Sequence, residues 1–203
     1  MSEKMSTATR ERLVVAVAEL MRTHGYSAIT VKQITVAAGA PMGSLYHHFP
    51  HGKVQIAAEA LRGSGAAYIQ LLPLLMDPHE DLRVAVPAAF DDAARTMAES
   101  GWMNMCPVGT VAGEIADSEP ALRAVAAEVV ADWIEQGTAY FARRGLAAAD
   151  ARDLVLGVLS GLEGAFLLAR TLRSAEPLHA AGKALAARVE QLLAEGSRTA
   201  VDS

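Results

Sequence analysis

Glycine and proline divide the chain into segments in which apolar residues recur at the three- and four-residue spacing of an amphipathic helix. Nine segments of this kind are expected to be helices: Thr7–Thr23, Val31–Ala38, Met42–His48, Gly52–Leu72, Glu80–Glu99, Val108–Ala116, Glu119–Arg143, Ala148–Leu172 and Leu178–Glu195. The sequence between them has no alternating strand pattern. Aromatic residues make up only 5% of the chain, which favours helix over sheet. The sequence therefore predicts an all-α protein.

Two short helices near the N-terminus are separated by a turn that contains glycine. Thr30 stands at an N-cap position, with Gln33 three residues later as its capping-box partner. Gly39 ends the first of these helices, and Pro41 suits the first position of the second. This arrangement is typical of a helix-turn-helix.

Charge is distributed unevenly along the chain. The net charge is −5, but residues 1–53 carry six Lys and Arg against three Glu, whereas the remainder carries 12 basic and 20 acidic residues. Four of the six histidines also lie in residues 1–53. A basic head on an acidic body fits a DNA-reading module joined to a body that avoids DNA.

Several spaced elements follow one another between Arg10 and Leu61: Gly25–Tyr26, Thr30–Val31, Ile34, Ala38–Gly39 and Gly43–Phe49. In this order they resemble the TetR family of repressors, and Phe49–Lys53 with Cys106–Val108 resembles its LmrA/YxaF-type branch. The resemblance implies a three-helix DNA-binding head over residues 1–62 and a helical ligand-binding and dimerisation body over residues 63–203. It also implies a homodimer formed through the last two long helices. One departure from the family pattern is Thr35, where alanine is common.

A recognition helix approaches the major groove closely, so small residues suit its N-terminal end. Ser44 can hydrogen-bond a base edge, and Met42 can touch a thymine methyl group. Leu45 and Phe49, four residues apart, are expected to be core anchors beneath this helix. The residues expected to contact DNA are Thr30, Pro41, Met42, Gly43, Ser44, Tyr46, His47 and Lys53.

The body contains a group of sulfur-bearing and aromatic side chains around a break between helices, and such side chains line adaptable apolar pockets. The residues expected to bind a ligand are Trp102, Met103, Met105, Cys106, Trp133, Phe166 and Glu163. The alternative for each is a place in the ordinary core. Glu114 and Glu163 are expected either to pair with arginine or to orient a ligand. Three glycines on one face of a helix, Gly157, Gly161 and Gly164, favour a subunit interface, with intrachain packing or space for a ligand as alternatives.

Other classes of protein fit less well. A single cysteine, Cys106, excludes an intrachain disulfide framework, and the adjacent His47 and His48 point apart, so neither metal nor cofactor is expected. The apolar uncharged run Gly63–Met76 is too short and too interrupted to cross a bilayer, which favours a soluble cytoplasmic protein. A small helical enzyme is the main alternative, but the sequence shows no nucleophile–base arrangement and no phosphate loop.

The predicted function is that of a ligand-responsive repressor. It binds a palindromic double-stranded operator as a homodimer and is released by a small apolar or aromatic effector. A helix-turn-helix regulator without a ligand, and an activator in place of a repressor, are the alternatives within this class.

Overall fold

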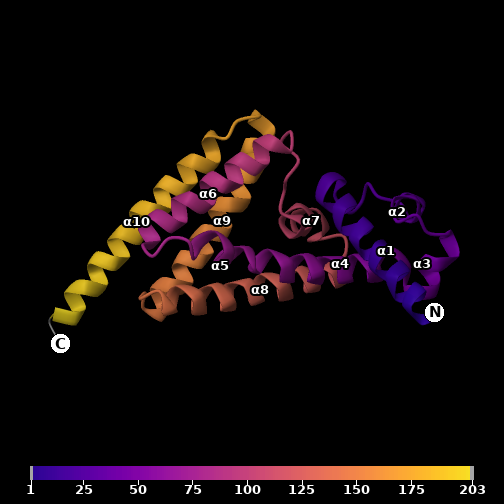
Figure 1. Cartoon of the computed structure of the whole chain (residues 1–203), viewed down its shortest axis with the longest axis horizontal. Coiled ribbons are helices and arrows are strands. Elements are labelled where there is room, and N and C mark those ends of the chain that lie inside the picture. Colours follow the sequence, from indigo (N-terminus) through magenta and orange to yellow (C-terminus); the bar gives the residue numbers. More distant parts are fainter. Residues whose placement is uncertain (1, 202–203) are drawn as a thin grey trace. The chain divides into compact units, whose positions relative to one another are not determined.

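The structure is a computed structural model that describes the backbone of residues 2–201 and the side chains of residues 7–196. Within these residues the chain forms ten α-helices and no strand, which confirms the predicted fold class (Figure 1). It divides into two compact units, Met1–Ala66 with Met105–Val130, and Ala67–Asn104 with Ala131–Ser203. Residues 105–130 thus share a unit with the N-terminal helices, although they lie beyond the domain boundary expected after residue 62.

The first unit contains the predicted helix-turn-helix. Its complete helices are α1 (Ser2–His24), α2 (Val31–Ala37), α3 (Met42–His48) and α7 (Pro107–Ile115), and it takes most of α4 (Gly52–Ile69) and the first half of α8 (Pro120–Arg143). Apolar residues with no exposed surface form its core: Leu13, Val17, Met21, Ile34, Leu45, Phe49, Ile56 and Leu61. Helices α1, α2 and α3 pack on one another, and α7 packs on α1.

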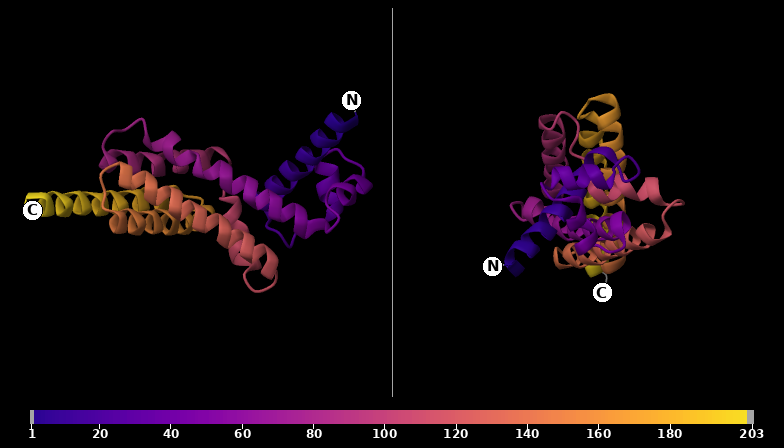
Figure 2. Two further views of the ribbon diagram at one scale, coloured as in Figure 1. Left: turned by 90° about the horizontal axis from the view of Figure 1, so that it is seen from below. Right: turned by 90° about the vertical axis from the view of Figure 1, so that its right-hand side faces the viewer.

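The second unit is a helical bundle. It contains α5 (Leu71–Met76), α6 (Leu82–Glu99), the second half of α8, α9 (Ala148–Leu172) and α10 (Glu176–Val201). Helix α10 packs along α6 and α9, and the three are seen side by side in Figures 1 and 2. Buried side chains from all of these helices fill its core: Met76, Val86, Phe90, Met97, Phe141, Leu154, Phe166, Leu178 and Val189.

Most predicted helix boundaries agree with the structure to within two residues, and those of α3 and α9 coincide with it. The expected helix Gly52–Leu72 is wrong at its end, because α4 stops at Ile69 and α5 follows at once. Pro73 was expected to terminate a helix but is the third residue of α5. The first turn of a helix tolerates proline, since its N–H groups have no partner within the helix.

Helix α9 is long and apolar enough to cross a membrane by length and composition, with 28% of its most apolar window buried. One such helix among the described residues is weak evidence for a membrane span, because core helices of soluble proteins meet the same criterion.

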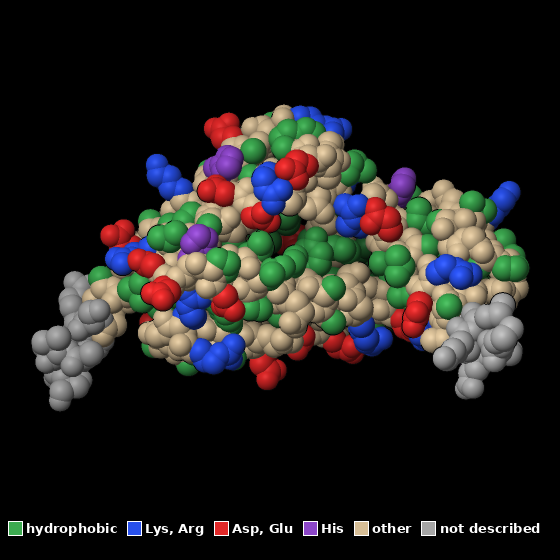
Figure 3. All heavy atoms as spheres, viewed as in Figure 1, with side chains coloured by type: hydrophobic (Ala, Val, Ile, Leu, Met, Phe, Trp, Pro, Cys, Tyr) green, Lys and Arg blue, Asp and Glu red, His purple; other side chains and the backbone are tan. Residues whose placement is uncertain are grey.

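On the face shown in Figure 3, acidic and basic side chains are interspersed among apolar ones.

Two glycines of α4 differ sharply in their surroundings. A Cβ atom at Gly65 would overlap with the γ-methyl groups of Val129 on α8, whereas one at Gly63 would meet nothing within 4 Å. The missing side chain at Gly65 therefore lets α4 and α8 approach closely.

We expect Gly65→Ala to lower the free energy of unfolding by about 1–3 kcal/mol, because the β-branched side chain of Val129 cannot move aside freely. Gly63→Ala is the matched control and should raise stability by about 0.5–1 kcal/mol through helix propensity. Urea denaturation of both variants measures the difference. Stabilisation by Gly65→Ala would show that the close approach imposes no constraint.

Candidate DNA-binding surface and effector pocket

The helix-turn-helix is held by local capping. The Thr30 hydroxyl accepts a hydrogen bond from the Gln33 amide at 3.3 Å, and the Gln33 side chain accepts one from the Thr30 amide at 2.8 Å, as predicted. Gly39 turns the chain with a φ of 58°, a conformation that favours glycine. Pro41 is the N-cap of α3 and not its first helical residue, one position earlier than expected.

Helix α3 has one buried and one exposed side. Leu45 and Phe49 have no exposed surface, so their prediction as core anchors is confirmed. The Arg10 guanidinium lies 5.1 Å from the centre of the Phe49 ring and also pairs with Glu59 of α4. Thr35 is accommodated because its buried hydroxyl donates to the carbonyl of Lys32 at 3.1 Å.

Most residues expected to contact DNA are accessible. Met42 is 46% exposed and Tyr46 is 52% exposed, in contrast to the two buried anchors of α3. Four further residues of the prediction are exposed and Ser44 is half-buried: Thr30, Pro41, Gly43 and His47 are the exposed ones. We call this set of seven the α3 surface.

Lys53 is placed differently. Its ammonium group lies 4.1 Å from the centre of the Tyr26 ring, and the side chain is half-buried. Burial lowers the pKa of Lys53, against the opposing charges of Glu114 and Glu119. Burial, with the charge of Glu119 and its hydrogen bond, raises the pKa of Tyr26 to about 12, so its hydroxyl stays protonated at neutral pH. The Lys53 ammonium group is thus already in contact with the Tyr26 ring.

Glu114 connects α7 to the turn between α1 and α2. Its carboxylate accepts hydrogen bonds from the backbone amides of Tyr26 at 2.6 Å and Ser27 at 2.7 Å. A Cβ atom at Gly25, whose φ is 77°, would lie 2.6 Å from the same carboxylate. Of the two expectations for Glu114, an arginine partner or a place in the pocket, neither describes this contact.

The surroundings of Glu114 favour its charged form. Burial alone would raise the pKa of this carboxyl. The hydrogen bonds from Ser27 and Tyr26, together with the charge of Lys53, outweigh burial and hold the pKa below its ordinary value of 4.5.

A cavity of about 180 Å³ lies within the second unit. Its lining comes from α4 and α5, α6, α8 and α9, and includes the rings of Tyr68 and Trp133, which stack with centroids 6.2 Å apart. Trp133, Phe166 and Glu163 line it, as the ligand prediction requires. An apolar cavity of about 150 Å³ is large enough to bind benzene, so this one can hold a ring-sized ligand.

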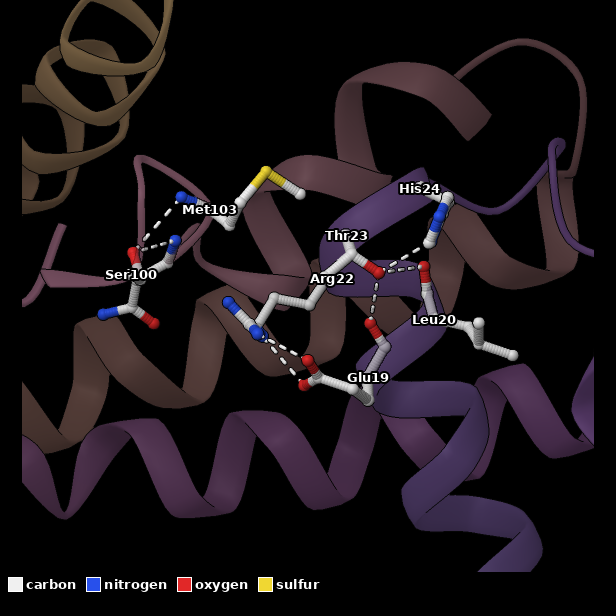
Figure 4. Close-up of polar contacts among 8 residues, drawn as sticks. Glu19, Leu20, Arg22, Thr23, His24, Ser100 and Met103 are labelled. Carbon is white, nitrogen blue, oxygen red and sulfur yellow. Dashed lines mark hydrogen bonds and ion pairs between the residues drawn. The ribbon is translucent and has the colours of Figure 1, made fainter. Parts of the chain in front are cut away.

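The other four residues proposed for the ligand do not line this cavity: Trp102, Met103, Met105 and Cys106. Cys106 is buried as the N-cap of α7, where its sulfur accepts from the Gly109 amide at 3.3 Å. The Ser100 hydroxyl accepts hydrogen bonds from the amides of Met103 and Asn104, of which Figure 4 shows the first. Of these two residues, Asn104 lines the cavity.

Figure 4 also shows two contacts near the end of α1. Arg22 pairs with Glu19, and the Thr23 hydroxyl donates a hydrogen bond to the backbone carbonyl of Glu19.

Helix α5 supplies lining residues that the sequence did not suggest: Leu71, Leu72, Leu75 and Met76. The expected helix ended at Leu72, within this group, and no helix was expected to follow it directly, although the apolar run was visible.

Comparisons with known proteins agree with both units. Residues 13–60 match the model of the tetR family of bacterial regulatory proteins, and residues 83–184 match that of the LmrA/YxaF-like transcriptional regulator C-terminal domain. The chain belongs to the TetR family, in its LmrA/YxaF-like branch. It is therefore a DNA-binding transcriptional regulator, and the enzyme alternative is excluded by the family.

Relatives of this TetR-family regulator align over most of its length. It is 32% identical to the uncharacterised regulator YxaF of Bacillus subtilis, over 84% of this chain and 89% of YxaF. LmrA of the same organism is 28% identical, over 84% of this chain and 90% of its own. A solved TetR regulator from Chloroflexus aurantiacus has 29% identity and a TM-score of 0.75, covering 93% of this chain and 97% of that one.

We expect Glu114→Gln to lower the free energy of unfolding at pH 7 by about 1 kcal/mol, since it keeps an acceptor but removes the charge. A lowered folded pKa means that the charged group stabilises the protein above pH 4.5 and loses this effect as the pH falls through the folded value. Urea denaturation should therefore show the difference from wild type shrinking in acid.

Glu128→Gln is the matched control. Its carboxylate pairs with Arg62 at 2.9 Å, with both side chains more than half exposed. An exposed pair contributes little, so this variant should change stability by less than about 0.5 kcal/mol. Equal losses for the two variants would argue against a special role for the Glu114 contact.

Proposed function

We propose that the protein is a cytoplasmic, ligand-responsive repressor that binds a palindromic operator as a homodimer and is released by a small apolar or aromatic effector. The observation that carries this proposal is the combination of the α3 surface in one unit with an apolar cavity in the other. A regulator that needs no ligand would gain stability from filling such a cavity with side chains. The cavity therefore favours ligand control over the ligand-independent alternative.

The α3 surface is proposed to enter the major groove. Its small residues, Gly43 and Ser44, permit close approach, and the exposed Met42 and Tyr46 flank them. Thr30 lies at the N-terminus of α2, where a hydroxyl and backbone amides can meet a phosphate. Lys53 is proposed only as a secondary phosphate contact, because its ammonium group already lies against the Tyr26 ring.

We expect Tyr46→Ala to weaken binding to all duplexes by about 1 kcal/mol, since a phosphate contact carries no sequence information. Ser44→Ala should instead change the preference among sites selected from random DNA. Val84→Ala on α6, at a residue 50% exposed, is the control and should bind as wild type. Failure of wild-type protein to enrich any palindromic site would refute operator recognition.

The proposed dimer face is on α9. Leu167 and Leu172 are each 61% exposed and Leu168 is 52% exposed, three large apolar side chains near the end of α9 that are unfavourable in water. The glycine argument does not support this interface: a Cβ atom at Gly157 or Gly161 would contact Leu185 of α10 in the same chain. Pairing through α9 also accounts for its high apolar content without a membrane.

We expect Leu167→Glu to weaken dimerisation at least about a hundredfold, because the carboxylate would be buried without a partner at the interface. Leu74→Glu is the control, since Leu74 is 68% exposed on α5 and lies outside the proposed face. Sedimentation equilibrium at micromolar concentration measures both. A monomeric wild-type protein would contradict the proposed dimer.

The proposed route from cavity to DNA follows helices that contribute to both units. Helix α4 carries Tyr68 of the cavity lining and Arg62 of the first unit, and α8 carries Trp133 and Val129 in the same way. An effector releases the operator only if it prefers the conformation with lower DNA affinity. A coupling of about 1–3 kcal/mol is sufficient for a useful switch.

A further inference from the structure

The lining of the cavity includes a pair of neutral polar side chains, Thr96 of α6 and Asn104 of the loop that follows this helix. The Asn104 side-chain amide donates a hydrogen bond to the Thr96 hydroxyl at 3.2 Å. The other polar side chains of the lining have interactions of their own within the chain: Tyr68, Asp92, Trp133 and Glu163. The hydrogen bonds of the Thr96–Asn104 pair can be followed atom by atom.

The Thr96 hydroxyl determines which way round the Asn104 amide lies. This hydroxyl donates its one proton to the backbone carbonyl of Ala93 at 3.1 Å, so toward Asn104 it can only accept. The NH₂ group of the amide must therefore face Thr96, as it does in the structure. The carbonyl oxygen of the same amide is consequently turned away from the hydroxyl.

The side-chain carbonyl oxygen of Asn104 accepts no hydrogen bond from the part of the chain that the structure describes. In that part of the chain, no side-chain oxygen or nitrogen is both buried and without a partner, so this oxygen is accessible. Asn104 also lines the cavity. A ligand that displaces water from the oxygen must supply a donor in its place, because an unpaired carbonyl in an apolar environment is unfavourable.

The loop between α6 and α7 fixes the position of Asn104. The Asn104 backbone amide donates to the Ser100 hydroxyl at 2.9 Å, and this hydroxyl donates to the carbonyl of Met97 at 2.9 Å. The carbonyl of Gly101 accepts a hydrogen bond at 2.7 Å from the guanidinium of Arg173, the C-cap of α9. An acceptor that is already held in place loses little conformational entropy on binding, which favours affinity.

We propose that the effector is an aromatic or apolar molecule that bears an N–H or O–H donor, and that the side-chain carbonyl of Asn104 accepts this hydrogen bond. The inference rests on the proposed effector function of the cavity and adds the chemical class of the ligand. Within the described chain, the lining includes no lysine, arginine or histidine. An anionic ligand would therefore be buried without a counter-charge.

Two neutral probes of nearly the same shape test the proposal. Indole carries an N–H donor, whereas benzofuran has an oxygen atom in place of this group and no donor. Titration calorimetry with the full-length protein should give a dissociation constant for indole about fivefold below that for benzofuran, the contribution of one hydrogen bond. Equal constants, or weaker binding of indole, would overturn the inference and leave the cavity as a binding site for rings.

Variants assign the preference to a residue. Asn104→Leu removes the acceptor at nearly constant size, and the Thr96 hydroxyl keeps its bond to Ala93. This variant should bind indole no better than benzofuran, with benzofuran affinity and helical content nearly unchanged. Asn104→Asp retains an acceptor and should retain the preference for indole. A preference that persists in Asn104→Leu would overturn the assignment.

Asp92→Asn is the matched control for a polar change elsewhere in the lining. The Asp92 carboxylate pairs with Arg95, so this variant should keep the preference of the wild type for indole. Loss of the preference in Asp92→Asn, with its retention in Asn104→Leu, would place the donor at a different side of the cavity and refute the proposal.

A cavity-filling variant separates this inference from the proposed function. Ala93 belongs to the lining, and Ala93→Phe should abolish binding of both probes. Indole binding that survives in Ala93→Phe would place the donor site outside the cavity and refute the proposal. Absence of binding by both probes to the wild type at millimolar concentration would refute the effector role of the cavity together with the assigned hydrogen bond.

Discussion

Burial of Leu45 and Phe49 is the interaction on which the DNA-reading part of the molecule depends. Helix α3 has seven residues, and isolated helices shorter than about 12–15 residues are marginal in water. Its two anchors are fully buried, with the Arg10 guanidinium against the Phe49 ring. Because the anchors hold the helix, its exposed residues are not needed to fill the core. Glycine, serine and tyrosine at those positions are therefore available for the proposed contacts with DNA.

A second constraint reaches the same unit from far along the chain. Glu114 lies 87 residues from Ser27, yet its carboxylate accepts hydrogen bonds from two backbone amides, those of Tyr26 and Ser27, just after α1 ends. The turn has few partners of its own, since Gly25 adopts a left-handed conformation and carries no side chain. The position of α7 is thereby linked to the entry of α2. Residues 105–130 accordingly belong to the compact unit of the N-terminal helices and not to the bundle.

Local signals predicted well, and long-range contacts did not. The Thr30–Gln33 capping box and the anchors of α3 depend on residues three or four positions apart, so the sequence contained them. The partners of Glu114 and the Leu185 neighbour of Gly157 lie on other helices, and no spacing rule reveals them. The group of sulfur-bearing residues around Cys106 suggested a pocket there. A cavity is the space left between helices after all of them have packed, so the composition of one segment does not locate it. Part of the cavity lining comes from α5, a helix that was not predicted because it contains Pro73.

Helix α9 belongs both to the cavity and to the proposed dimer face. Its residues Leu159, Leu162 and Glu163 line the cavity, while Leu167 and Leu168 further along the same helix are exposed. Glycines on a further side bring α10 close, so the helix cannot shift without disturbing that packing. A rigid helix turns a small displacement at the cavity into a displacement at its outer surface, since packed interfaces rearrange between discrete states. If α9 forms the dimer contact, an effector beside Glu163 acts on the relation between two subunits, and hence on the spacing of two recognition helices along the DNA.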